Sequence, residues 1–261
     1  MNHWLTPFNR RNVWLTRVAV IHMVVFVVLL VLMWSDSRQI TGVNIWLKPA
    51  KFALSISVYL LTMAWLLGEL KRPGWLIGVA VTVIIAAMSL EQLLITLQAA
   101  RETTSHYNNA TPFDSAVFSL MGFGVAANSL AATLVLGLFL YHGSGDRPAY
   151  WMGIRAGLAI FLLGSVQGFA MIANGGHTVA GEDGGPGIPL LAWSNVAGDL
   201  RVAHFIGIHA IQVLPLAGWL IDRTRLEPGW KVRAIALLAV GYAGLGLVVH
   251  WLAMQGRPVF I

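Results

Sequence analysis

Long apolar runs separated by polar segments dominate the chain. Seven of them are long enough for a helix to cross the hydrocarbon core of a bilayer, which takes about 20 residues. They cover residues 14–34, 46–67, 75–98, 116–140, 151–173, 200–221 and 232–254. Because lipid offers the backbone no hydrogen-bond partner, each run is predicted to be helical. The pattern predicts an all-α integral membrane protein in which residues 1–261 form a single seven-helix transmembrane domain.

The basic residues indicate how these helices are oriented. Of the 17 lysines and arginines, eleven fall on the side of the N-terminus and six on the other side. Cytoplasmic segments are enriched in these residues, so the N-terminus is predicted to be cytoplasmic and the C-terminus external. Two long loops, residues 99–115 and 174–199, are then external. We expect the protein to lie in a bacterial cytoplasmic membrane.

Composition supports the membrane assignment and excludes several kinds of chemistry. The 261 residues are 57% hydrophobic and only 11% charged, whereas an ordinary soluble domain is about a quarter charged. The net charge is +6, but the basic residues flank the apolar runs, so the lipid bilayer rather than nucleic acid is the expected partner. The sequence contains no cysteine, which excludes disulfides and thiolate metal sites.

The run at residues 200–221 carries ionisable groups in its first half. Arg201, His204, His209 and Gln212 all fall there, and ionisable groups at membrane depth usually mark a functional site. His204 and His209 are five residues apart, so their side chains diverge on a helix. They therefore do not form the pair, four residues apart, that binds one zinc ion in HExxH motifs.

Other runs bring polar groups to a similar depth in the predicted outer half. The second run begins with Lys48 and Lys51, and Glu91 lies about 10 Å below the outer end of the third. Gln98 ends the third run, and Gln167 and His250 lie in the outer parts of the fifth and seventh runs. The inner half holds few such groups. We therefore predict a polar cavity in the outer half, open to the external loops or capped by them.

Three stretches together resemble a family of bacterial multi-pass membrane proteins of similar length to which no activity is assigned. They are Trp46-Leu47-Lys48-Pro49-Ala50-Lys51-Phe52, Gln98-Ala99-Ala100-Arg101 with Ser105-His106-Tyr107-Asn108, and Asp199-Leu200-Arg201-Val202-Ala203-His204-Phe205. The resemblance covers most of the chain. It implies that these stretches belong together, and it transfers no function.

The leading functional hypothesis is an oxidoreductase that binds haem b or a divalent metal. His204 and His250 come from different helices at comparable depth, so they are the candidate ligands of an iron or another metal. The candidate contacts to haem propionates or other anionic groups of a cofactor are Lys48, Lys51, Arg101 and Arg201.

Two alternatives remain open at the level of sequence. One is a metal-dependent hydrolase of a lipid-like, membrane-soluble substrate, with Glu91 as a further metal ligand or as general base and His209 as a catalytic or substrate-contacting residue. The other is a non-enzymatic binder or transporter of a small anion, attracted by Lys48, Lys51 and Arg201. The sequence leaves undecided whether the protein is an enzyme and what its oligomeric state is.

Overall fold

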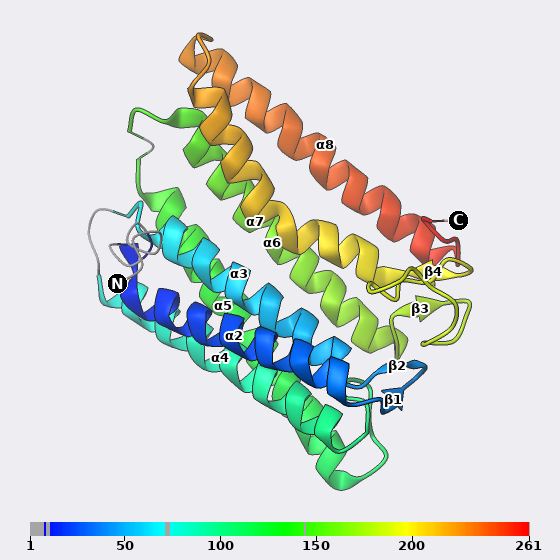
Figure 1. The fold of residues 1–261 in the computed structure, drawn as a ribbon. Coiled ribbons are helices and arrows are strands. Elements are labelled where there is room, and N and C mark those ends of the chain that lie inside the picture. The colour runs from blue at the N-terminus through cyan, green and yellow to red at the C-terminus, as the bar shows by residue number, and fades with distance from the viewer. Residues whose placement is uncertain (1–7, 9–10, 71–73, 144, 261) are drawn as a thin grey trace. The chain divides into compact units, whose positions relative to one another are not determined.

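The computed structural model describes residues 8, 11–70, 74–143 and 145–260 (Figure 1). Within these residues seven helices are long and apolar enough to cross a membrane, which confirms the predicted number of long apolar helices. They are α2 (Val13–Ser35), α3 (Leu47–Leu67), α4 (Trp75–Ala100), α5 (Pro112–Tyr141), α6 (Pro148–Asn174), α7 (Leu200–Asp222) and α8 (Pro228–Met254). The helices indicate an integral membrane protein, while the direction of insertion stays a prediction.

Three helices begin three or four residues earlier than the apolar pattern predicts. α5, α6 and α8 start at Pro112, Pro148 and Pro228. Proline is well tolerated in the first turn, because its fixed φ suits the helix and its missing N–H would have no intrahelical partner there. Hydropathy alone places these starts too late, because the first turn of each helix combines proline with polar or aromatic residues in place of a continuous aliphatic run.

Two short antiparallel strand pairs, which the hydropathy pattern does not predict, connect the helices. β1 (Gln39–Ile40) pairs with β2 (Val43–Asn44) between α2 and α3. Thr41 and Gly42 make the turn with φ of 51° and 77°, and such positive φ values at both turn positions are typical of tight hairpins. β3 (Thr178–Val179) pairs with β4 (Gly198–Asp199). The second long loop is therefore closed at its base.

The chain divides into two compact units, residues 1–135 and 136–261, and the boundary falls within α5. The expectation of a single domain stays a prediction.

In the first unit, α3 packs against α2 and α4. One buried apolar cluster, at the end of the unit that carries the β1–β2 hairpin, contains Leu29, Ile45, Trp46, Ala50, Ala53 and Ala99. A second cluster joins α4 to the start of α5 and contains Leu94, Ile95, Val117 and Met121. These two clusters fix the ends of α3, α4 and α5 that carry Lys48, Glu91 and Asp114.

In the second unit, α6, α7 and α8 lie side by side, and α6 and α7 approach most closely (Figure 1). Glycines make this approach possible. A Cβ atom added at Gly157 would lie 2.8 Å from the carbonyl oxygen of Ala210, and one added at Gly164 would lie 2.8 Å from the carbonyl carbon of Gly207. Small residues at such crossings allow helix backbones to pack directly against each other in membranes.

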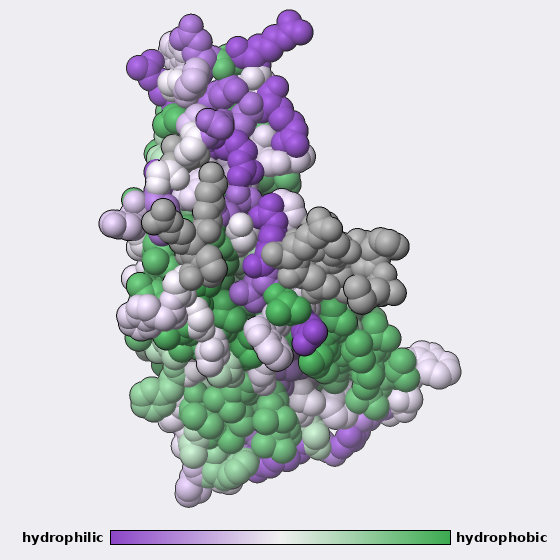
Figure 2. All heavy atoms as spheres, turned by 90° about the vertical axis from the view of Figure 1, so that its left-hand side faces the viewer, coloured by the Kyte–Doolittle hydropathy of each residue, from purple (hydrophilic) through white to green (hydrophobic). Residues whose placement is uncertain are grey.

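The surface of the second unit separates into apolar flanks and a basic end. Leu237 and Val240 on α8 are exposed, as expected of side chains that face lipid. Figure 2 shows hydrophilic residues gathered at the upper end of the view, where α7 ends and α8 begins. Arg223, Arg225 and Arg233 are exposed there. This is one of the ends that the charge distribution predicts to be cytoplasmic.

Candidate functional site

The start of α3 sets the position of Lys48. The indole N–H of Trp46 donates to Asp36 Oδ2 at 2.9 Å, and its backbone N–H donates to Asn44 Oδ1 at 2.9 Å. The guanidinium of Arg38 also binds Asp36 and, with the Trp46 indole, holds the pKa of that carboxyl well below its usual range. The hairpin and these contacts hold the first turn of α3, including Lys48, against the end of α2.

A histidine from the loop between α4 and α5 lies beside this lysine. The Nζ atom of Lys48 is 3.1 Å from Nδ1 of His106, and Ser105 Oγ is also 3.1 Å from that nitrogen. The other ring nitrogen, Nε2, is 3.7 Å from Glu91 Oε1. Lys48, His106 and Glu91 thus form a chain from the start of α3 to the interior of α4, called the acid–base chain below.

The loop that carries His106 is itself fixed. The side-chain amide of Asn108 donates to Thr103 Oγ1 at 2.8 Å and to the carbonyl oxygen of Thr104 at 2.9 Å. Aromatic rings surround the imidazole of His106, with centroid separations of 6.0 Å to Phe52 and 6.1 Å to Phe118. The imidazole is therefore held in one position against α3 and α5.

Glu91 is the deepest member of the acid–base chain. Its residue surface is only 3% exposed, and its Oε2 atom has no hydrogen-bond partner among the described residues. Its neighbour Gln92 is also buried and donates to Thr96 Oγ1 at 3.0 Å, yet Gln92 Oε1 has no partner within the described chain. A buried acceptor without a partner is uncommon in native proteins and calls for an explanation.

The hydrogen-bonding capacity of each group gives the acid–base chain a direction. A lysine ammonium has only donors, so Nδ1 of His106 acts as the acceptor towards Lys48. The neutral ring then carries its proton on Nε2, which faces Glu91. The three groups are therefore ordered donor to acceptor from Lys48 to the buried carboxylate, and the last separation, 3.7 Å from Nε2 to Glu91 Oε1, is longer than a hydrogen bond. Sequence reasoning selected Lys48 and Glu91 but missed His106, for which the Ser105-His106-Tyr107-Asn108 stretch was the available signal.

Gln98 and Arg101 lie close to the acid–base chain in sequence but belong to a separate, satisfied cluster. Asp114 Oδ1 accepts from Gln98 Nε2 at 2.9 Å and from Arg101 at 2.6 Å. Arg101 also donates to Gln98, and its guanidinium lies 4.6 Å from the ring centroid of Phe113. These contacts tie the end of α4 to the start of α5. Lys51 lies partly buried on α3. The predicted contacts of Arg101 and Lys51 with a cofactor stay predictions.

In the second unit, His204 makes a contact that differs from those of the other helix histidines. Its Nδ1 lies 2.7 Å from the carbonyl oxygen of Gly164 on the neighbouring helix α6. His22, His142 and His209 instead place Nδ1 near the carbonyl oxygen four residues earlier in their own helix. Since a carbonyl oxygen only accepts, Nδ1 of His204 carries the proton, and Nε2 is left with the lone pair that a metal or another donor requires.

The other two candidate histidines differ from His204 and from each other. The ring of His209 lies 4.0 Å from that of Phe205, centroid to centroid, and this contact accounts for its orientation. His250 on α8 is partly buried, and its Nδ1 atom has no hydrogen-bond partner among the described residues. The assigned roles of both residues stay predictions.

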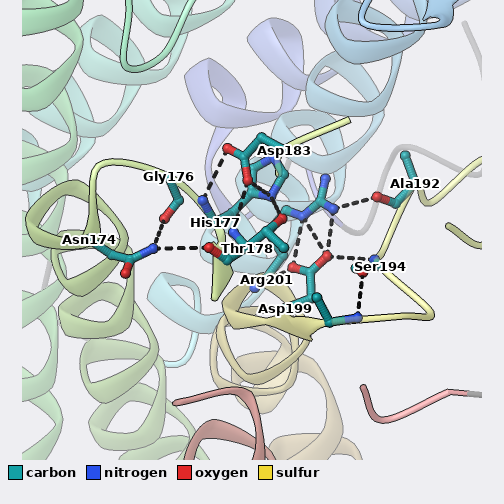
Figure 3. A network of polar contacts seen from close by, with 10 residues as sticks. Asn174, Gly176, His177, Thr178, Asp183, Ala192, Ser194, Asp199 and Arg201 are labelled. Carbon is teal, nitrogen blue, oxygen red and sulfur yellow. Dashed lines mark hydrogen bonds and ion pairs between the residues drawn. The ribbon is translucent and has the colours of Figure 1, made fainter. Parts of the chain in front are cut away.

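Arg201 takes part in a closed network with the loop between α6 and α7 (Figure 3). Asp199 Oδ1 accepts from Arg201 Nε at 2.9 Å, and Asp199 Oδ2 accepts from the backbone N–H of Ser194 at 2.8 Å. Arg201 also donates to the carbonyl oxygen of Ala192. Burial raises the pKa of the Asp199 carboxyl, but the hydrogen bonds and charge of Arg201 and the Ser194 N–H outweigh burial, so the pKa lies below its ordinary value.

No group of three or more His, Cys, Asp or Glu side chains that could hold a metal ion occurs in the part of the chain that the structure describes. Comparisons with protein-family models, curated proteins and solved structures found no match to this chain. The candidate sites are therefore the acid–base chain of the first unit and His204 of the second. The first is supported by the incompletely hydrogen-bonded Glu91, and the second by the contact of His204 with Gly164.

Proposed function

We propose that this membrane protein takes up protons from the predicted outer side at Glu91, through His106 and Lys48, in the coupled transport of a small anion. Chains of carboxylates and histidines at membrane depth are typical of proton-coupled transporters. The basic groups at the start of α3, Lys48 and Lys51, supply the positive charge that attracts an anion.

The observation that carries the proposal is the state of the Glu91 carboxyl. It is buried, one of its oxygens has no partner among the described residues, and the other faces an imidazole nitrogen at 3.7 Å. A fixed structural carboxylate would have both oxygens satisfied, because leaving a buried acceptor unpaired costs about 1–3 kcal/mol. A group that alternately gains and loses a proton needs one oxygen available for it.

The proton transfer can be written with every bond accounted for. The N–H bond at Nε2 of His106 breaks and an O–H bond forms on Glu91, while Nδ1 gains a proton from the Lys48 ammonium. A hydronium ion at the outer end then reprotonates Lys48 and becomes water, and the ring, left with its proton on Nδ1, must exchange that proton for one on Nε2 before the next transfer. The distance of 3.7 Å exceeds that of a direct hydrogen bond, so the imidazole must approach by about 0.7 Å or a water must bridge the two groups.

Flux measurements in vesicles test this function. Purified protein in phosphatidylcholine vesicles receives an external acid pulse in the presence of phosphate, acetate or nitrate, and an enclosed pH-sensitive dye reports proton entry. Wild-type protein should accelerate entry with at least one of these anions. Glu91→Gln should abolish the acceleration, because an amide cannot exchange the proton, and His106→Gln should slow it strongly.

The matched control is Glu182→Gln, since Glu182 is exposed in the second external loop. It should leave the flux unchanged. Size-exclusion profiles establish that each variant is folded. Flux in Glu91→Gln equal to that of wild type, or wild-type flux that ignores the pH gradient, overturns the proposal. A second readout is the infrared carbonyl band of a protonated buried carboxyl, which should be lost in Glu91→Gln alone.

A second candidate function is the binding of haem b or a metal ion by His204. Its support is the Nδ1 contact with Gly164, because metal-ligating histidines usually donate their other ring N–H to a carbonyl or carboxylate. Absorption spectra and metal content of the purified protein test it. His204→Ala should lose a bound group that His209→Ala retains, and a wild-type protein with neither haem nor stoichiometric metal ends the proposal.

The metal-dependent hydrolase is the weakest of the three hypotheses. A catalytic metal site generally needs three protein ligands, and no such group occurs among the residues that the structure describes. The surroundings of Glu91 also suit proton transfer better than metal binding, because its basic neighbours are His106 and Lys48.

A further inference from the structure

A small cavity of about 30 Å³ lies between α6, α7 and α8 of the second unit. Gly164 and Gln167 of α6, Gly207 of α7, and Tyr242 and Gly246 of α8 form part of its wall. A volume of about 10–15 Å³ already admits one water-sized group, so the cavity accommodates a small polar group together with the first atoms attached to it. None of its wall residues belongs to the acid–base chain.

The cavity contains one polar atom whose hydrogen-bonding capacity is unused. Gln167 Oε1 is buried and has no hydrogen-bond partner among the described residues. Tyr242, the other polar side chain in the wall, donates its hydroxyl hydrogen to the carbonyl oxygen of Ile206 at 2.7 Å, so that hydrogen is not available to Gln167. Gln167 Oε1 can therefore accept a hydrogen bond from a group that enters the cavity.

The rest of the cavity indicates what kind of molecule carries that group. The wall is otherwise apolar, and Leu163 and Leu247 at its edge are 57% and 63% exposed on helices that are expected to face lipid. A ligand can therefore enter from the bilayer with an apolar chain and leave that chain between exposed leucines. Charged ligands are disfavoured, because none of the residues of the wall carries a charged side chain at neutral pH.

We propose that this cavity binds the hydroxyl group of a membrane-soluble alcohol with a long apolar chain, and that Gln167 is its hydrogen-bond partner. A hydroxyl both donates and accepts, so it satisfies the amide of Gln167 in either of the two orientations that differ by exchange of its oxygen and nitrogen. His250 lies one turn further along α8 from Gly246 on the same face, and its buried Nδ1 offers a second polar contact towards the outer end.

Photolabelling in nanodiscs tests the proposal. The probes are a diazirine-bearing decan-1-ol and the matching diazirine-bearing decane, both in phosphatidylcholine nanodiscs that contain the full chain, with labelled peptides mapped by mass spectrometry. The alcohol should label the outer halves of α6, α7 and α8 about tenfold more than the hydrocarbon does, because one satisfied buried acceptor is worth roughly that factor.

Two variants and their controls assign the labelling to the cavity. Gln167→Leu removes the acceptor and should reduce labelling by the alcohol to the level of the hydrocarbon, whereas Gln255→Leu at the exposed end of α8 should not. Gly246→Leu should fill the cavity, since a Cβ atom there makes only an ordinary contact with Ile206 at 3.7 Å. Gly241→Leu, which meets nothing within 4 Å, is its control.

Equal labelling by the two probes means that the cavity holds water only and overturns the proposal. Labelling by the alcohol that persists in Gln167→Leu also overturns it, because the alcohol then binds elsewhere. These variants do not change the acid–base chain, so proton flux in Gln167→Leu should stay at the wild-type level. The flux measurement therefore distinguishes a failure of alcohol binding from a failure of the proposed function.

Discussion

Two buried carboxyl groups, one in each unit, illustrate different uses of the same chemistry. Asp199 is 2% exposed and Glu91 is 3% exposed. Both oxygens of Asp199 accept hydrogen bonds, from Arg201 and from the backbone of Ser194. Glu91 has one oxygen without a partner among the described residues and one oxygen 3.7 Å from His106. The two carboxyl groups therefore differ in how many of their oxygens accept a hydrogen bond from the surrounding residues.

This difference separates a structural role from a chemical one. A fully satisfied buried carboxylate holds its neighbours in place, and removing its charge leaves their donors unpaired. An incompletely satisfied carboxyl contributes little to stability but can bind a proton or a ligand. Four measurements, ordered by the size of the change in stability, test this contrast.

The largest effect is expected at Asp199. Asp199→Asn keeps the shape of the side chain but leaves the Arg201 guanidinium without its charge partner. Breaking a buried ion pair costs about 3–5 kcal/mol, and because the arginine side chain is a quarter exposed we expect the lower end of that range. Denaturant unfolding of the purified protein measures the loss. The control is Glu182→Gln in the same loop, and equal stability of the two variants contradicts the structural role.

The same network predicts a dependence on pH. The pKa of Asp199 is lower in the folded protein than its ordinary value, so the folded state binds this proton less readily than the unfolded state does. Its contribution to stability is therefore full above the unfolded pKa of about 3.9 and is lost as the pH falls through the folded pKa. The stability difference between wild type and Asp199→Asn should shrink over that range. A constant difference contradicts the prediction.

A smaller loss is expected at the crossing of α6 and α7. Gly164→Val places side-chain atoms against the backbone of Gly207, and overpacking of this kind costs about 1–3 kcal/mol. The backbone of α6 must move to make room for the valine, and this movement also displaces the carbonyl oxygen of Gly164 that His204 contacts. Gly241→Val on α8, where a Cβ meets nothing within 4 Å, is the matched variant. Unfolding curves of the two should differ, and identical curves would show that the helices separate without cost.

The smallest change in stability is expected at Glu91. Glu91→Gln replaces an incompletely satisfied carboxyl by a neutral amide of similar shape, so its unfolding free energy should change by less than about 1 kcal/mol. Proton flux should nevertheless disappear. A loss of stability as large as that of Asp199→Asn would show that both carboxyls are structural, and it would remove the contrast between the two units.

The sequence was informative about the helices because membrane spans have a strong one-dimensional signal. The length of each apolar run predicts its helix, and depth along the run identified Lys48 and Glu91 as unusual. His106 was missed because a loop residue can lie anywhere within reach of its chain. Only the packing of α3 against α4, and the bonds that fix the loop at Asn108, bring its imidazole between those two residues.

The histidines of the second unit illustrate the same division. The sequence indicated that His204 and His209 diverge, because a spacing of five residues turns the side chains apart on any helix. It could not indicate that His204 contacts Gly164 while His209 contacts Phe205 of its own helix. That outcome depends on the close approach of α6, which glycines on both helices permit.

The amino-acid sequence alone was enough to predict the seven long apolar helices of the described residues, their ends to within four residues, and the polar groups at unusual depth. These properties are local, because lipid forces each apolar run to satisfy its own backbone. Only the tertiary structure decided which buried carboxyl is satisfied and which is not. Asp199 has its main partner two residues away, whereas the partners of Glu91 come from another helix and from a loop, so their distances depend on how the helices pack.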